Sequence, residues 1–193
     1  TTAFWTNLVA AYGVQLVYTN TLARTPHHTE FQRTYAGDME FRKGYWKHVK
    51  ERFFYVEELM MRDGLTDVIS MEYDILVYGK FSDLLVKLLK APSAGLRMVM
   101  DLETRGHPGF LYVRSAADIG GFNNFLCASA ASGLEDMQSL AMYSQLFESQ
   151  VRFFPVIPAA RNTGPRRSLV GHVTANPTFL SQDYEHFGNL FVG

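Results

Sequence analysis

The chain has 193 residues, 47% apolar and 14% aromatic, and its 18 basic and 19 acidic side chains give a formal net charge of -1. This composition excludes a disordered chain and a small disulfide-stapled scaffold, because it supplies enough apolar surface for one sizeable core. It also provides no overall basic field to hold nucleic acid. The single cysteine, Cys127, lies among apolar and small residues. We expect it to be a buried filler, and its solitude favours a reducing compartment such as the cytosol.

The first 23 residues carry no charge, but they do not predict a membrane span. Polar residues and Gly13 interrupt the stretch, and no basic segment precedes it. We interpret it as a strand, a short helix and a second strand, Val14–Thr19. A polar loop from Asn20 to His28, which contains Pro26, is predicted to follow. Because the chain begins at Thr1 and stops directly after the start of another expected element, we interpret it as a piece of a longer domain.

Residues 40–61 are predicted to form a helix, because apolar side chains recur in them every three or four residues from Tyr45 to Met60. Gly64 is the expected left-handed cap of this helix. Val68–Met71 reads as a short buried strand and is followed by the acids Glu72 and Asp74.

Strands and helices are predicted to alternate through the second half of the chain. We expect helices over 82–90, 116–132 and 134–146, and strands over 96–102, 110–114 and 151–157, with a turn at 105–109 and polar loops after Pro158. This alternation indicates an α/β fold in one domain spanning residues 1–193.

The strongest local signal for chemistry is Glu72-x-Asp74. Two acids one residue apart at the end of an apolar strand can share a divalent cation with phosphate oxygens, and hard oxygen ligands suit Mg²⁺ or Mn²⁺. The same tripeptide also occurs by chance at solvated strand ends, which is the alternative interpretation.

Arg52 is the second candidate, about twenty residues before the acids. Its planar guanidinium could bridge to a diphosphate or to the acidic pair, and the neighbouring phenylalanines pull it toward the core. For Lys47, Lys50 and Glu51, on the same helix, we favour a solvated charged face.

Glu135 and Asp136 follow Gly133 and open the helix predicted over 134–146. Acids in a first helical turn are favoured by the helix dipole, so capping is one interpretation. The other is a general base, or a carboxylate that hydrogen-bonds a sugar hydroxyl. For Asp136 both interpretations stay open.

In this order, the parts resemble GT-A-type glycosyltransferases. The resemblance covers about residues 45–158 and rests on an Arg-bearing helix, a short connection, an apolar strand and an acidic motif like their DxD. It continues downstream in a strand and an acidic helix start, and is carried by Arg52-Phe53-Phe54-Tyr55, Met71-Glu72-Tyr73-Asp74, Gly109-Phe110-Leu111-Tyr112-Val113-Arg114-Ser115, Glu135-Asp136-Met137 and Phe154-Pro155-Val156-Ile157-Pro158.

The resemblance implies a mixed, Rossmann-like sheet flanked by helices and a divalent metal on the diphosphate of a nucleotide sugar. It implies Glu72 and Asp74 as metal ligands, with His172 preferred to His186 as a later one. His172 can equally be a surface residue. Glu72 stands where Asp is commoner. For His27 and His28 we favour loop polarity or substrate contact over metal binding.

Function then has two readings. The first is a metal-dependent glycosyltransferase that moves a sugar from a nucleoside-diphosphate sugar to an acceptor hydroxyl on a glycan, lipid, protein or small molecule. Arg52 and Asp74 would bind the donor, Thr19 and Asn20 would contact its nucleotide, and Asp136 or Glu135 would position or deprotonate the acceptor. The second is a non-catalytic domain that only binds a sugar nucleotide. Neither reading includes nucleic acid or a transmembrane segment.

Overall fold

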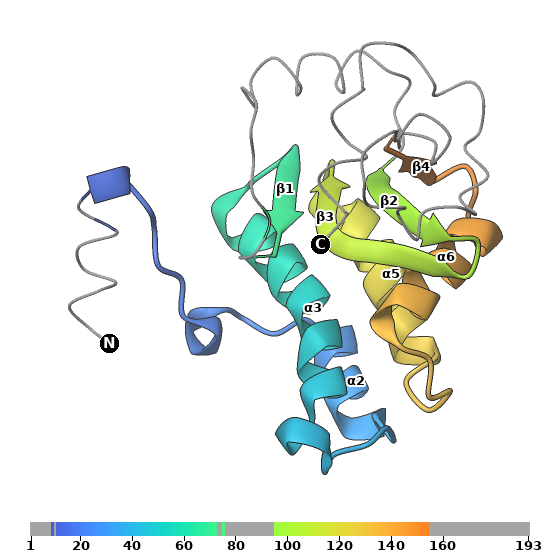
Figure 1. Ribbon diagram of the computed structural model, residues 1–193. Coiled ribbons are helices and arrows are strands. Elements are labelled where there is room, and N and C mark those ends of the chain that lie inside the picture. Colours follow the sequence, from blue (N-terminus) through green and yellow to red (C-terminus); the bar gives the residue numbers. More distant parts are fainter. Residues whose placement is uncertain (1–8, 10, 73–74, 76–94, 155–193) are drawn as a thin grey trace, which may run out of the picture.

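The structure is a computed structural model that describes residues 9, 11–72, 75 and 95–154, and in this part it is mixed α/β (Figure 1). Its sheet has the strand order β1-β3-β2-β4, with β3 antiparallel to both neighbours and β4 parallel to β2. The strands are β1 (Val68–Met71), β2 (Leu96–Leu102), β3 (Arg105–Val113) and β4 (Val151–Phe153). The α/β class predicted from the sequence is confirmed at this level.

Helices pack against the sheet and against one another. α3 contacts α5, α2 contacts α5, and α6 lies on β3. The helices are α2 (Pro26–Thr34), α3 (Tyr45–Asp63), α5 (Ala116–Ala128) and α6 (Asp136–Leu146), with the 3-10 turns η1 (Thr19–Thr21) and η2 (Phe41–Lys43). Within the described ranges, no helix combines the length and the apolar character needed to cross a bilayer.

Aromatic side chains join three of the helices in the core. The ring of Phe53 on α3 meets Phe122 on α5 at 5.1 Å, and Phe122 meets Tyr143 on α6 at 5.2 Å. All three are buried, and burying each stabilises the fold by about 2–3 kcal/mol. Cys127 is half-buried beside this core, less buried than expected, and burial raises the pKa of its thiol.

Four predicted elements that rest on local patterns are confirmed with small shifts. α3 ends at Gly64, whose φ of 64° is the expected left-handed cap. β1 has the predicted bounds but is half-buried to exposed where a buried strand was expected. α3 begins five residues later than predicted, α6 begins two residues later, and α5 ends four residues earlier. The predicted helix 82–90 and the end of the last predicted strand lie outside the described residues.

Two N-terminal predictions are wrong. Val14–Thr19 forms no strand, because its backbone pairs with none of the strands that the structure describes, and β-propensity without a partner strand does not make one. The loop predicted from Asn20 to His28 is instead interrupted by α2. Pro26 occupies the first helical position, which suits its fixed φ, and the Thr25 hydroxyl caps the helix by accepting from the His28 backbone N–H.

The turn predicted at 105–109 is also wrong, because these residues belong to β3 and the chain turns at Glu103 and Thr104. Between Met98 and Val99 of β2, the pairing on β3 jumps from Leu111 to His107. The extra residues form a bulge around Pro108, which has no N–H to donate to the ladder. β3 therefore bends in its middle (Figure 1).

Polar side chains hold α2 on α3. His28 is fully buried and pairs with Glu58 at 2.7 Å, while His27 pairs with Glu57 at 2.6 Å. Glu51 accepts from Gln32 at 2.7 Å and lies 3.8 Å from His28. These histidines therefore lie on a helix and pack it against α3, so the loop position expected from the sequence is wrong.

This packing predicts a pH dependence of stability. Burial alone would lower the pKa of His28, but its interactions with Glu51 and Glu58 outweigh burial and raise it above 6.5. Burial opposes, yet His28, Gln32 and His48 together lower the pKa of Glu51 from 4.5 to about 2. His28 therefore stabilises the folded state fully below pH 6.5, and this stabilisation is lost as pH rises through its raised pKa. Glu51 stabilises the folded state fully above pH 4.5, and this stabilisation is lost as pH falls toward 2.

We therefore expect these two groups to stabilise the fold most between pH 4.5 and 6.5. The check is urea denaturation across that range and up to about pH 8.5, on the wild type and His28→Gln. In His28→Gln, the free energy of unfolding should no longer fall as pH rises above 6.5. A wild-type slope in His28→Gln would contradict the assignment.

Candidate functional site

Arg52 joins three elements of the fold through one guanidinium. Its Nη1 donates to Glu72 Oε1 after the end of β1, and its Nη2 donates to Asp136 Oδ2 at the start of α6, at 2.5 Å. These partners lie 20 and 84 residues from Arg52 in the sequence. The pairing expected between Arg52 and the first acid of Glu72-x-Asp74 is thus present, and Asp136 joins it.

Backbone pairing fixes the position of Glu72. Its N–H donates to the Gly109 carbonyl at 3.0 Å, which extends the β1–β3 ladder one residue beyond the Met71–Phe110 pair. The Glu72 side chain is 34% exposed and that of Asp136 only 8%, so the site is open at Glu72 and closed at Asp136. Asp74, His172 and His186 lie outside the described residues.

The sequence left open whether the acids at the start of α6 cap the helix or point into the site, and the structure gives these positions to different residues. Glu135 is exposed and is the N-cap of α6, with its backbone N–H donating to Gln138 Oε1 at 3.0 Å. Asp136 is buried, and its Oδ1 accepts from the Met137 backbone N–H at 2.9 Å. The capping residue is therefore Glu135, and the carboxylate directed at Arg52 is that of Asp136.

Burial raises the pKa of Asp136 above its ordinary 3.8, and the nearby Glu72 charge raises it further. The Arg52 charge and the Met137 N–H act in the opposite direction without cancelling the effect of burial. A carboxylate held with a raised pKa is a stronger base than a solvated one, and both oxygens of Asp136 already accept hydrogen bonds, Oδ2 from Arg52 and Oδ1 from the Met137 N–H.

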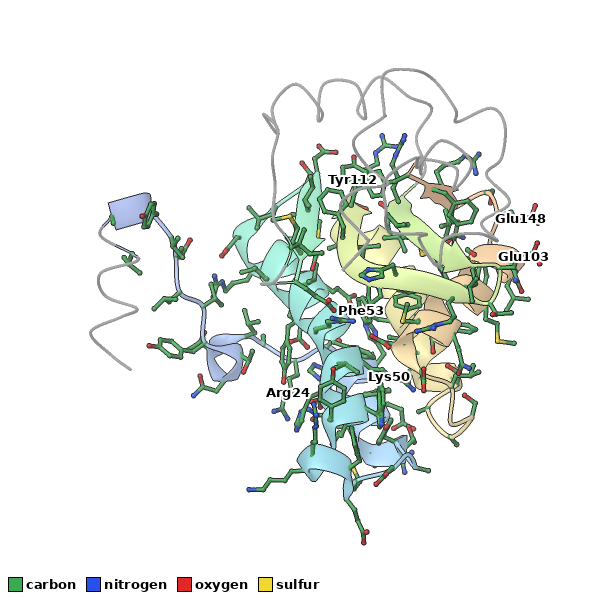
Figure 2. The ribbon with its side chains drawn as sticks, in the orientation of Figure 1. Arg24, Lys50, Phe53, Glu103, Tyr112 and Glu148 are labelled. Carbon is green, nitrogen blue, oxygen red and sulfur yellow. The ribbon has the colours of Figure 1, made fainter. Side chains whose placement is uncertain are left out.

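The solvated charged face predicted for Lys50 and Glu51 is wrong. It is 3% exposed and Glu51 is 4% exposed, so both are buried. Burial lowers the pKa of Lys50, while Asp136 and Glu135 raise it through their charges. Lys50, labelled in Figure 2, lies on the side of α3 that faces α6 and supplies a second cation near Asp136.

His107 is a candidate that the sequence reading missed. A Cβ added to Gly109 would lie 2.6 Å from His107 Cε1 and 3.2 Å from Glu72 Oε2, so glycine lets the imidazole lie close to the site carboxylate. The Gly109 N–H donates to His107 Nδ1 at 3.0 Å, and an accepting Nδ1 leaves the ring hydrogen on Nε2. His107 thus lies beside Glu72, with its Nδ1 held by the backbone of the same strand. The signal was Gly-His-Pro-Gly inside a strand, a pattern typical of a bulge.

Replacing Gly109 with alanine should displace the His107 ring and destabilise the fold by about 1–3 kcal/mol, because the new methyl overlaps the imidazole. The check is chemical denaturation of Gly109→Ala, His107→Ala and the double variant. In the His107→Ala background, Gly109→Ala should cost clearly less, since the overlapping ring is gone. Strictly additive losses would contradict the contact.

Thr19 and Asn20 are not brought to this site. Both are exposed on η1, which stands to the left of α3 in Figure 1, whereas α6 lies to its right. Their expected contact with a nucleotide stays a prediction.

The described residues alone do not make a metal centre. Among them, no three or more His, Cys, Asp or Glu side chains are grouped so that they could hold a metal ion. Glu72 uses Oε1 on Arg52, and its Oε2 is one oxygen of the kind that Mg²⁺ and Mn²⁺ prefer. A metal at this site would need Asp74 as well, and the donor chemistry of two neighbouring carboxylates fits such an ion.

Comparison with known proteins returned no match of any kind, whether to a protein-family model, to a curated protein or to a solved structure.

Proposed function

We propose that this chain is a glycosyltransferase domain that moves a sugar from a nucleoside-diphosphate sugar to an acceptor hydroxyl, assisted by a divalent metal. The observation that carries the proposal is the bridge by which Arg52 joins Glu72 at the end of a strand to Asp136 at the start of a helix. The resemblance of the sequence around these residues to GT-A-type enzymes supports it.

In this proposal Asp136 is the general base. Its carboxylate takes the proton of the acceptor hydroxyl as the acceptor oxygen bonds to the anomeric carbon, and the bond from that carbon to the diphosphate oxygen breaks. The electron pair of the broken bond leaves with the nucleoside diphosphate. Arg52 holds Asp136 in place and keeps a positive charge near the site.

Glu72 and Asp74 would hold the metal, which when bound neutralises charge on the leaving diphosphate. Lys50 adds a buried cation on the Asp136 side of α3.

The test is hydrolysis and transfer of a panel of nucleotide sugars with Mn²⁺, on the wild type, Asp74→Ala and the control Asp63→Ala. Asp63 is paired with Arg62 on the surface at 2.7 Å, so its loss should leave activity unchanged. Activity that survives Asp74→Ala unchanged would refute the metal role.

Calorimetry separates the proposal from its alternative. Metal-dependent nucleotide binding without turnover would support a non-catalytic sugar-nucleotide-binding domain. Absence of both binding and turnover over the whole panel would refute both readings and leave the Arg52 bridge as a structural ion-pair network.

A further inference from the structure

Residues 11–18, which we call the N-terminal arm, lie apart from the other described elements and expose apolar side chains. Tyr12 and Tyr18 are 80% and 68% exposed, and Leu16 is 37% exposed. The arm is rooted at the buried Leu22, and in Figure 1 it leads away from the helices and the sheet, on the side where β1 is the outermost strand. No residue of the arm is charged. Such a run of exposed apolar side chains marks an interaction surface.

The second half of the arm has the composition of a strand but no strand beside it. Val14, Val17 and Tyr18 are of the types that favour strands. Tyr18 is extended, and the backbone of residues 14–17 forms no backbone hydrogen bond with the part of the chain that the structure describes. A neighbouring strand would pair with these groups and cover the side chains.

β1 is an edge strand of the described sheet and is open to such pairing. The strand order places β3 on one side of β1 and, among the described residues, no strand on the other. The Glu72 N–H donates to the Gly109 carbonyl. Because alternate residues pair in an antiparallel ladder, Ile69 and Met71 direct their N–H and C=O groups to the open edge. Charged residues and proline commonly protect such edges, and β1 contains neither.

Exposed apolar side chains border this open edge. Met71, at the end of β1, is 43% exposed. Met61 and Leu65, on the segment that leads from α3 into β1, are 61% and 39% exposed. An arm paired with β1 would therefore find apolar surface beside the strand as well as backbone partners along it.

The charged side chains of residues 61–71 have partners within the chain. Arg62 pairs with Asp63 at 2.7 Å, and Asp67 accepts from the Tyr112 hydroxyl at 2.5 Å. A partner without charge suits this surface, because it does not have to replace these contacts. The uncharged arm meets that requirement.

We propose that the N-terminal arm pairs with the open edge of β1 in a second copy of the chain, so that two copies exchange arms. Residues 14–18 would add a further strand to the sheet of the other copy. A second copy fits better than the arm's own edge, because within one chain the arm pairs with none of the described strands. Exchange in both directions closes a two-fold dimer. This inference does not depend on the proposed transfer activity.

The size of the contact agrees with a dimer built in this way. Each copy contributes its arm, residues 11–18, and its edge segment, residues 61–71, near the lower end of the about 20–30 residues a side that a stable interface uses. One arm on one edge would supply only half of this contact. The dimer therefore needs both exchanges to be stable.

The test is size-exclusion chromatography with light scattering on the whole chain over a range of concentrations, where the wild type should dimerise. The double variant Leu16→Pro, Val17→Pro removes two successive N–H groups, one of which must face the paired edge, and should weaken dimerisation by about tenfold or more. Met71→Lys places a lysine at the open edge and should weaken it similarly. Met142→Lys is the matched control: Met142 is 44% exposed on α6, and its variant should dimerise as the wild type does.

Mixing the two weakened variants identifies the pairing of arm with edge. The proline variant keeps an intact edge and Met71→Lys keeps an intact arm, so the mixture should associate more tightly than either variant alone. Circular dichroism verifies that each variant is folded. A wild type that is monomeric at every concentration, a dimer that survives both variants, or a mixture that associates no better than its components would overturn the proposal.

Discussion

Replacing Arg52 with methionine should destabilise the fold by about 2–3 kcal/mol at neutral pH and abolish transfer activity. The side chain keeps much of its length, but the buried carboxylate of Asp136 loses its cation, and an unpaired buried charge is more costly than a paired one. The loss should shrink on acidification, because Asp136 with its raised pKa then becomes neutral. Urea denaturation at about pH 7.5 and about pH 4.5 measures both effects.

Two variants control this experiment. Arg33→Met removes a surface arginine that pairs with Glu30 at 2.5 Å, and it should change stability little, because that pair is solvated. Arg52→Lys keeps the charge but has no planar fork to reach two carboxylates at once, so it should recover only part of the stability. An Arg52→Met protein as stable as the wild type at both pH values would show that the bridge does not hold Asp136.

Elements whose signal is local could be predicted from the sequence. The apolar spacing of α3, the glycine after it and the short run Val68–Met71 each report their own conformation. The pairing of Arg52 with the acid after β1 was expected on chemical grounds, because the planar fork of a guanidinium binds carboxylates and the neighbouring phenylalanines draw Arg52 toward the core.

Features that depend on distant partners could not be predicted in the same way. Lys50 reads as solvated because nothing near it in sequence shows that Tyr35 and Asp136 surround it, yet its Nζ lies 5.5 Å over the Tyr35 ring. The approach of His107 to Glu72 depends on two tertiary pairings: the bulge in the β2–β3 pairing places His107, and the β1–β3 pairing places Glu72. The site therefore contains groups whose role is set by tertiary contacts alone.

α2 was missed for a different reason. Proline was taken to mark a loop, although a proline directly after a threonine cap is equally a helix start. Reading it so would also have placed His27 and His28 on the helix face that meets Glu57 and Glu58.

Asp136→Asn separates a catalytic role of this residue from a structural one. The amide has the same size and removes the buried charge, but it turns one oxygen into a donor that faces either Arg52 or the Met137 N–H. These effects oppose each other, so stability should stay within about 2 kcal/mol of the wild type. Transfer activity should fall by about 10²–10⁴, the usual contribution of a general base.

The pH profile of stability gives a readout independent of activity. Because burial raises the folded-state pKa of Asp136 above 3.8, this group favours the folded state most below pH 3.8, and that contribution is lost as pH rises through the raised pKa. The free energy of unfolding of Asp136→Asn should not show this decrease with rising pH. Glu135→Gln is the matched control: Glu135 is exposed and caps the helix, so its variant should keep both activity and the wild-type pH profile. If Glu135→Gln were inactive and Asp136→Asn active, the base would have to be reassigned to Glu135, and burial beside Arg52 would then serve stability alone.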